Sequence, residues 1–276
     1  MEADKLPVSV VIPVRDDPLL RQAIASVPLG VELIVAMTAP ATETRLSVAQ
    51  AKLCRPDIIA VETSTPGMSA GVNLGVRAAS NQKIVILDSD CTLEPQTIRA
   101  YSVALDETAF VRGRTFARRC GGWSEFAGLG QESLNETFAR RARLIGPSIA
   151  FLKEPFLALG GYDEDSGASC DHEFVLRMED AGLTTGFAEN AVVWHQPYTF
   201  TLDCRAHLGY GRSMNYIDCK RRGRYGFRIC LMRWYPSVLR AKLIRRGTAS
   251  VFRSLLLGGM MLLGYVEARI RRKLGR

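Results

Sequence analysis

Residues 84–91, with the sequence IVILDSDC, constrain the fold of this chain more than any other segment. Four apolar residues, most of them β-branched, run directly into two aspartates one residue apart. An unbroken apolar run of this length is typical of a strand buried on both faces, as in the middle of a parallel sheet. Such a strand delivers the next residues to the carboxyl edge of the sheet, where open α/β folds bind ligands. We therefore expect Asp88 and Asp90 at a crevice, as hard oxygen donors suited to Mg²⁺ or Mn²⁺ and a phosphate-bearing substrate.

Apolar runs and helical patterns alternate along the first part of the chain. Strands are expected at residues 8–13, 33–37, 58–61 and 83–87, with a short one at 109–111. Helices are expected between them, at residues 16–26, 42–54, 70–80 and 95–105. This alternation favours right-handed βαβ units, so the predicted fold class is α/β, with a mostly parallel central sheet flanked by helices.

The pattern becomes less regular after residue 111. Residues 112–122 are rich in Arg and Gly and predict an exposed loop, whereas residues 123–143 predict a helix. A strand is expected at 148–152, a helix at 154–159, and a further helix at 171–181 that ends before Gly182. The last expected strand, at residues 191–194, ends at His195.

Length and composition favour one large domain with an appendage. The chain has 276 residues, of which 47% are hydrophobic and 23% charged, as in an ordinary globular protein. Its seven cysteines include no C-x-x-C pair, so neither a disulfide framework nor a zinc ribbon is indicated. The acidic N-terminus lacks the pattern of a signal peptide, which makes the cytoplasm the default location.

The charge distribution divides the chain near residue 200. Residues 1–200 carry 18 Lys and Arg against 25 Asp and Glu, whereas residues 201–276 carry 18 against 3, a net charge of +15. The basic character thus belongs to the last quarter of the chain, which is expected to meet an anionic surface.

Six short motifs occur in an order that is typical of one enzyme family. They are VSVVIPVRDD at residues 8–17, GMSAGVNLG at 67–75, ILDSD at 86–90, GGYDE at 160–164, CDHEFVLR at 170–177 and VVWH at 192–195. Over roughly residues 7–200 the chain resembles a family 2 glycosyltransferase, an inverting enzyme with the GT-A fold. The resemblance implies a GT-A catalytic domain at 1–200 and a basic, partly apolar helical region at 201–276.

The resemblance also implies a binding site for a nucleotide sugar. Its nucleotide contacts are expected from Pro13, Val14, Asp16, Asn73, Asp88 and Ser89. Asp90 is expected to bind the metal ion, with Asp88 facing the ribose or completing the metal's coordination, and His195 as a further ligand. Two alternatives stay open, because Asp16 or Asp17 fits a helix cap and His195 beside Trp194 fits a buried structural histidine.

Asp171 matches the catalytic base of the family. A carboxylate there takes the proton of the acceptor hydroxyl as it attacks the anomeric carbon, and direct attack from the opposite face inverts that carbon. An N-cap role for Asp171 and a base role for the neighbouring Glu173 are the alternatives.

Two departures from the family pattern bear on the substrates. Residues 33–38 lack the aspartates that relatives carry after the second strand, so a family contact to the nucleotide base is missing or replaced, which counts against UDP. The expected donor is a UDP-sugar or another nucleoside diphosphate sugar. Cys170 stands where an acidic residue usually precedes the base. The acceptor is expected to be a glycan or a lipid-linked sugar.

The basic region points to a membrane. Residues 254–266 are apolar and lie between Arg240, Lys242, Arg245 and Arg246 on one side and Arg269, Arg271, Arg272 and Lys273 on the other. This pattern is typical of a helix that lies among lipid headgroups, so we expect a protein peripheral to the inner face of the cell membrane. A tilted or re-entrant insertion and a helix packed on the catalytic domain are the alternatives. Basic and aromatic residues alternate at 207–233, including the run KRRGRY at 220–225, but the acidic preceding domain has no nucleic-acid motif, so no nucleic-acid partner is expected.

Two other classes of function compete with sugar transfer. A nucleotidyltransferase would need a Gly-rich phosphate loop after the first strand, and Val14-Arg15-Asp16-Asp17 lacks one. A degenerate, membrane-attached binding module is compatible with the missing second-strand aspartates, but the intact Asp88, Asp90 and Asp171 argue against it.

Overall fold

The computed structural model describes residues 6–221 and 251–275 of the chain. Its strands are β1 (Val8–Val14), β2 (Glu32–Thr38), β3 (Ile58–Thr63), β4 (Lys83–Ile86), β5 (Cys91–Leu93), β6 (Phe110–Ala117), β7 (Ile149–Leu152) and β8 (Gly186–His195). Its helices are α1 (Leu20–Ser26), α2 (Thr42–Cys54), α3 (Met68–Ala78), α4 (Thr97–Ala104), α5 (Trp123–Arg140), α6 (Lys153–Ala158), α7 (Cys170–Asp180) and α8 (Phe200–Lys220), with a 3₁₀ turn, η1 (Gly167–Ser169), and a C-terminal helix, Val251–Lys273.

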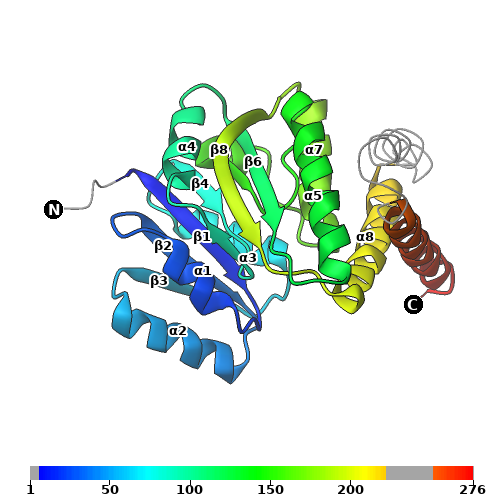
Figure 1. The fold of residues 1–276 in the computed structure, drawn as a ribbon, viewed down its shortest axis with the longest axis horizontal. Helices are drawn as coiled ribbons and strands as arrows, with labels where there is room; N and C mark the ends of the chain where they lie inside the picture. The colour runs from blue at the N-terminus through cyan, green and yellow to red at the C-terminus, as the bar shows by residue number, and fades with distance from the viewer. Residues whose placement is uncertain (1–5, 222–250, 276) are drawn as a thin grey trace.

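All eight of these strands form one sheet in the order β3-β2-β1-β4-β7-β6-β8-β5 (Figure 1). The strands β3, β2, β1 and β4 are parallel, and β6 is parallel to β8. The strand β7 is antiparallel to both β4 and β6, and β5 is antiparallel to β8. The predicted α/β class with a mostly parallel sheet is therefore confirmed, and the antiparallel pairs lie in its second half.

Two hydrophobic cores cover the two faces of the sheet, as the alternation of side chains along β1 requires. Val10 and Ile12 of β1 point into a core that α1, α2 and α4 complete. Val11, between them, points into the other core with residues of α3, α6 and α7. The helix α3 lies so close to the sheet that a Cβ on Gly71 would be 2.9 Å from Thr38 Cγ2. The glycines of α3 thus fix how near its first turns lie to the carboxyl ends of β1 and β2.

The prediction of an exposed loop at residues 112–122 is wrong in its first half. Residues 112–117 continue β6, which pairs with β7 on one side and β8 on the other. Arg112, at the centre of the sheet, is only 1% exposed. Because Arg and Gly are depleted in buried strands, the composition of this segment indicated a loop.

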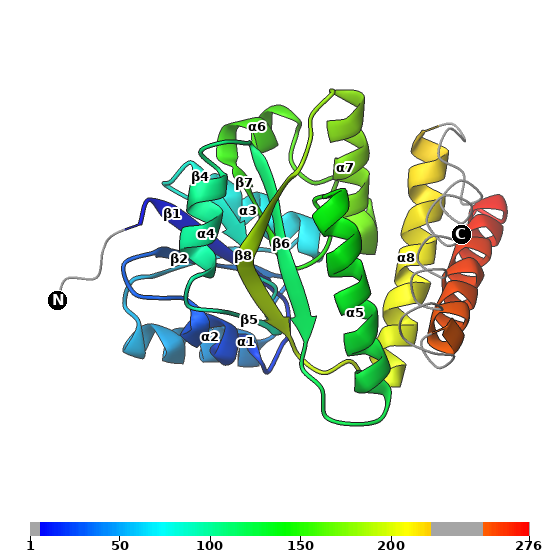
Figure 2. The same ribbon diagram turned by 45° about the horizontal axis from the view of Figure 1, so that its top comes forward.

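The C-terminal helix packs along α8 at the end of the molecule far from β3 (Figures 1 and 2). The two helices touch through their backbones, because Gly211 of α8 meets the Met261 carbonyl and Gly264 meets the Leu208 carbonyl. Polar contacts join them along their length, from Arg253 with the buried Asp203 to Tyr265 Oη donating to Asp218 Oδ2 at 2.7 Å. The described part of the basic region is thus a pair of parallel helices, whereas residues 222–250, with most of the KRRGRY run, lie outside the described residues.

Candidate active site

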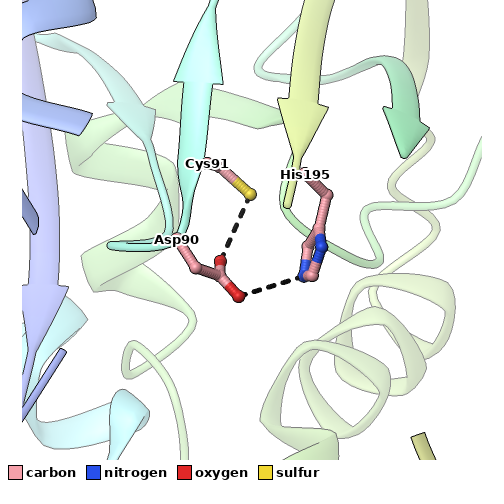
Figure 3. Close-up of side chains that lie close together, drawn as sticks. All are labelled: Asp90, Cys91 and His195. Atoms are coloured by element: carbon pink, nitrogen blue, oxygen red, sulfur yellow. Dashed lines mark hydrogen bonds and ion pairs between the residues drawn. The ribbon is translucent and has the colours of Figure 1, made fainter. Parts of the chain in front are cut away.

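The pairing of β5 with β8 brings Asp90 and His195 together. Cys91 lies opposite His195 in the antiparallel register, and Gln196 N donates to the Asp90 carbonyl at 3.2 Å. As a result, His195 Nε2 is 3.1 Å from Asp90 Oδ2, and Cys91 Sγ is 3.4 Å from Asp90 Oδ1 (Figure 3). The candidate ligand atoms of these three residues all lie within 4.8 Å of one another.

The surroundings of His195 fix which ring nitrogen faces Asp90. His195 Nδ1 is 2.7 Å from the Gln196 carbonyl, which only accepts, so Nδ1 carries a proton and Nε2 faces the carboxylate. The ring stacks on Tyr198 with centroids 4.2 Å apart. Burial opposes a charge on this imidazole, but the hydrogen bond and the charge of Asp90 raise the pKa of His195. Burial likewise opposes ionisation of Asp90, but the hydrogen bond and charge of His195, together with the hydrogen bonds from Cys91 and the backbone, lower the pKa of that carboxyl.

Asp88 follows β4 and carries a buried oxygen without a partner. Within the described part of the chain, Asp88 Oδ1 has no hydrogen bond. Burial, and next the charge of Asp90, raise the pKa of Asp88 to about 7. A buried, unpartnered carboxylate oxygen beside a second carboxylate and an imidazole fits a divalent cation, which would satisfy it and offset the repulsion. Cys91 is buried, and burial raises the pKa of its thiol well above the usual range, so it is present as the neutral thiol.

Asp171 lies in the first turn of α7, two residues after Ser169 at the N-cap position. Its Oδ2 accepts from the Gly146 backbone N–H at 2.8 Å, and its Oδ1 from the His172 N–H at 2.7 Å. Burial raises the pKa of Asp171, although these two N–H donors and the charges of Arg112 and Arg143 oppose the rise. The carboxylate is thus held at the helix end, as the capping alternative supposed, without occupying the cap position itself.

The alternative base, Glu173, is 1% exposed and fully engaged. Its Oε2 lies 2.7 Å from Arg177 Nη2, and its Oε1 lies 3.1 Å from Lys220 Nζ of α8. Because both oxygens are held by cations, Glu173 is placed to join α7 and α8 and not to accept a substrate proton.

The loop after β1 brings several predicted nucleotide contacts to the same edge of the sheet. Pro13 and Val14 end β1. Asp16 Oδ1 accepts from Ala41 N at 2.9 Å and from Thr44 Oγ1 at 3.1 Å, so it holds the start of α2. Asp17 Oδ1 accepts from Leu19 N at 2.8 Å, and Ser89 Oγ donates to Asp17 Oδ2 at 2.7 Å. Both aspartates therefore make helix-start contacts, and Ser89 ties the residues after β4 to the loop after β1.

Asn73 of α3 is 4% exposed, and its amide is engaged within the protein. Its Nδ2 donates to the Tyr162 carbonyl at 2.8 Å and to Glu164 Oε1 at 3.0 Å, and Tyr162 N donates to its Oδ1 at 2.8 Å. Two sequence motifs, GMSAGVNLG and GGYDE, are thus joined by this one side chain. The predicted contact of Asn73 with a nucleotide stays a prediction.

Sequence reasoning missed two contributions to the site. Arg112 lies on β6, in a segment whose Arg- and Gly-rich composition indicated a loop and not a strand. The helix α8, assigned to the tail, contributes Lys220, which also pairs with Asp163 of the GGYDE motif at 2.6 Å. It also contributes Tyr210, which is 37% exposed as a whole, but desolvation of its hydroxyl and then the charges of Asp171 and Asp88 raise its pKa. Neither residue type carries a sequence signal for such a role, since Lys and Tyr are common on exposed helices.

The fold and this arrangement at the carboxyl edge of the sheet define a glycosyltransferase of the GT-A class. The sequence profile of glycosyl transferase family 2 matches residues 9–152, more than half of the chain, and the chain belongs to that family.

Two solved structures share the fold. One is the mannosyltransferase PcManGT from Pyrobaculum calidifontis in complex with GDP-Man and Mn²⁺, with a TM-score of 0.64 at 16% identity, covering 98% of this chain and 89% of that one. The other is TarS 1–349 from S. aureus, with a TM-score of 0.52 at 12% identity, covering 98% of this chain and 92% of that one. No curated protein sequence matches the chain.

Proposed function

We propose that this glycosyltransferase is an inverting, divalent-cation-dependent enzyme that moves a sugar from a nucleoside diphosphate sugar to a hydroxyl of a glycan or lipid-linked acceptor. One observation carries the proposal: the unpartnered, buried Asp88 Oδ1 beside the Asp90–His195 pair, with the Asp171 carboxylate close enough to raise the pKa of Asp88. Carboxylates that repel one another in this way fit a site that receives a cation and a phosphate-bearing substrate.

Three residues would hold the cation. Asp88 and Asp90 supply hard oxygens, and His195 supplies Nε2, whose orientation is fixed through Nδ1 and the Gln196 carbonyl. When bound, the cation neutralises the negative charge that develops on the departing nucleoside diphosphate. Imidazole in the set favours Mn²⁺ over Mg²⁺.

Asp171 is the group that takes the proton from the acceptor hydroxyl. The two backbone N–H groups hold its oxygens in place, so a single orientation of the carboxylate is presented to the acceptor. One direct displacement, with the acceptor entering opposite the leaving group, inverts the anomeric carbon.

The donor is best identified by a screen of nucleotide sugars. The resemblance to a structure crystallised with GDP-Man and Mn²⁺ argues for testing guanine donors beside UDP-sugars, because β2 and its end lack the expected aspartates. We expect one donor to bind with Mn²⁺, to lose affinity in chelator, and to be hydrolysed slowly to nucleoside diphosphate and a sugar whose first-formed anomer is inverted. Retained configuration, or equal rates in chelator, would contradict the mechanism, and release of pyrophosphate from nucleoside triphosphates would favour a nucleotidyltransferase.

We further propose that the pair formed by α8 and the C-terminal helix binds the cytoplasmic face of the cell membrane. Within the described residues the C-terminal helix, with 23 residues, is by length and composition the one candidate membrane span. It exposes six large apolar side chains, Phe252, Leu255, Leu262, Leu263, Val266 and Ile270, and Leu274 directly after it is also exposed. Its packing on α8, which carries charged residues such as Asp203 and Arg212, argues for a helix lying in the headgroup region. The proposed boundary near residue 200, between the catalytic domain and the basic C-terminal region, stays part of this proposal. The two regions are in contact, because Lys220 of α8 pairs with Glu173 of α7.

Sedimentation with lipid vesicles tests the membrane proposal. We expect the full chain to bind anionic vesicles, more weakly in high salt because each Lys or Arg contributes about 1 kcal/mol that salt screens. Replacing Leu255, Leu262 and Leu263 with Asn should release the protein, whereas the same change at the exposed Leu46 and Leu53 of α2 should not. No binding at low salt would contradict the proposal, and binding that resists both salt and carbonate would favour a transmembrane helix.

A further inference from the structure

Arg112 is a buried cation that forms no ion pair with any described residue. It lies on β6 and is 1% exposed, yet its Nε and Nη1 have no hydrogen-bond partner in the described part of the chain, and no described carboxylate lies within ion-pair distance. Burial lowers the pKa of this guanidinium to about 10, so it is still charged at neutral pH. An unpaired buried charge lowers stability, and a folded protein retains one at a cost that some other property must offset.

The contacts of Arg112 lead to the candidate base. Its guanidinium lies over the Phe138 ring of α5, with Cζ 4.0 Å from the centroid. On another side is Gly146, where a Cβ would be 3.4 Å from Arg112 Nη1 and where φ is +87°. The N–H of this same Gly146 donates to Asp171 Oδ2 at 2.8 Å. One residue therefore separates the guanidinium from the carboxylate, and a side chain at position 146 would disturb both.

We propose that Arg112 is a positioning residue for sugar transfer: its guanidinium packs against Gly146 and so holds the Gly146 N–H against the Asp171 carboxylate. The inference rests on the proposed role of Asp171 as the base. Arg112 acts through Gly146 and through its charge, and it does not touch the substrate.

Several charged or titratable groups face Asp171 from the surrounding elements. They are Arg112 of β6, Arg143 before β7, Asp88 after β4, Tyr162 before η1, Tyr210 of α8 and the adjacent Cys170. Of the two cations, Arg143 is paired with Glu179 at 3.2 Å, whereas Arg112 is unpaired. Without Arg112, burial would still be opposed by the two backbone N–H donors and by Arg143, but the pKa of Asp171 would rise further and its carboxyl would stay protonated to higher pH.

Substitutions at Arg112 separate positioning from a structural role. Arg112→Met removes the charge and leaves a side chain that can pack on Phe138, whereas Arg112→Lys keeps the charge. Arg114→Met, on the same strand but with an ion pair to Glu189, is the matched control. We expect Arg112→Met to fold with an unchanged or higher Tm, because it removes a buried unpaired cation. Loss of folding or a lower Tm in both Arg112 variants would show a structural residue and overturn the proposal.

Infrared titration gives a readout that needs no substrate. The carbonyl stretch of protonated Asp171 is identified as the infrared band that disappears in Asp171→Asn. This band should persist to higher pH in Arg112→Met than in the wild type. In Arg112→Lys its pH dependence should stay close to that of the wild type. Hydrolysis of the donor selected by the screen should show the acidic limb of kcat moved to higher pH in Arg112→Met, with an unchanged KM. Arg114→Met should change neither profile. An unmoved band and limb would overturn the inference.

The failure of the inference and that of the proposed function are distinguishable. If Asp171→Asn turns over normally, Asp171 is not the base, and the role of Arg112 in transfer falls with it. If Asp171→Asn is inactive but Arg112→Met leaves the titration unmoved, the proposed function stands and the inference alone is wrong.

Discussion

Asp90→Asn is expected to abolish metal-dependent sugar transfer, with a loss of about 10²–10³-fold in kcat. The substitution keeps the shape of the side chain but removes its charge, so the proposed cation loses a carboxylate ligand and His195 loses its ion-pair partner. Donor affinity in Mn²⁺ should fall toward the value that the wild type shows in chelator. Calorimetric donor titrations with Mn²⁺ and with chelator, together with turnover, measure both effects.

The chain provides a matched control for this experiment in its second D-x-D sequence. Asp165, in the connection before η1, follows Asp163 by two residues as Asp90 follows Asp88, and its backbone N donates to Asp163 Oδ1 at 3.1 Å. Asp165→Asn is expected to leave donor affinity and turnover unchanged. Full activity of Asp90→Asn, or wild-type activity in chelator, would contradict the metal proposal.

Asp171→Asn is expected to lower kcat by about 10²–10⁴-fold while leaving donor affinity unchanged. Removal of the acceptor proton belongs to the transition state, whereas the donor binds before it, so kcat and kcat/KM should fall together. Single-turnover transfer and donor calorimetry in Mn²⁺ separate the two quantities.

Glu173→Gln is the informative comparison for Asp171→Asn. Because Glu173 pairs with both Arg177 and Lys220, its substitution should lower Tm and leave the chemical step largely intact. If Asp171→Asn keeps its turnover but loses donor affinity or stability, the Asp171 carboxylate serves only to hold the start of α7.

The parts of the site that could be predicted are those whose signal lies within one short segment. The buried strand that ends at Asp88 is visible in four apolar residues, and the alternation of strands and helices is visible in hydrophobic periods. By contrast, Asp16 holds the start of α2 through Ala41, 25 residues further on, whereas sequence reasoning placed it at the start of the helix that directly follows it. The partner of Asn73 lies 89 positions away, so its engagement could not be derived from its neighbours.

Arg112 illustrates a second kind of limit. The middle of β6, Arg-Gly-Arg-Thr at residues 112–115, has the composition of an exposed loop, and only the pairing with β7 and β8 makes it part of an inner strand. Tertiary pairing here overrides local propensity, which happens where a site requires a polar side chain inside a sheet.

The pairing of β5 with β8 has a consequence for the order in which the protein is assembled. Glu94 and Trp194, which hydrogen-bond across this pair, are 100 positions apart, so Asp90 meets His195 only after the loop between them has closed. The ribosome releases the first four parallel strands long before β8, because synthesis proceeds from the N-terminus. A nascent chain that has already built most of its sheet would therefore still lack the imidazole of the proposed cation site, and the enzyme would gain its metal affinity at nearly the last step of its folding.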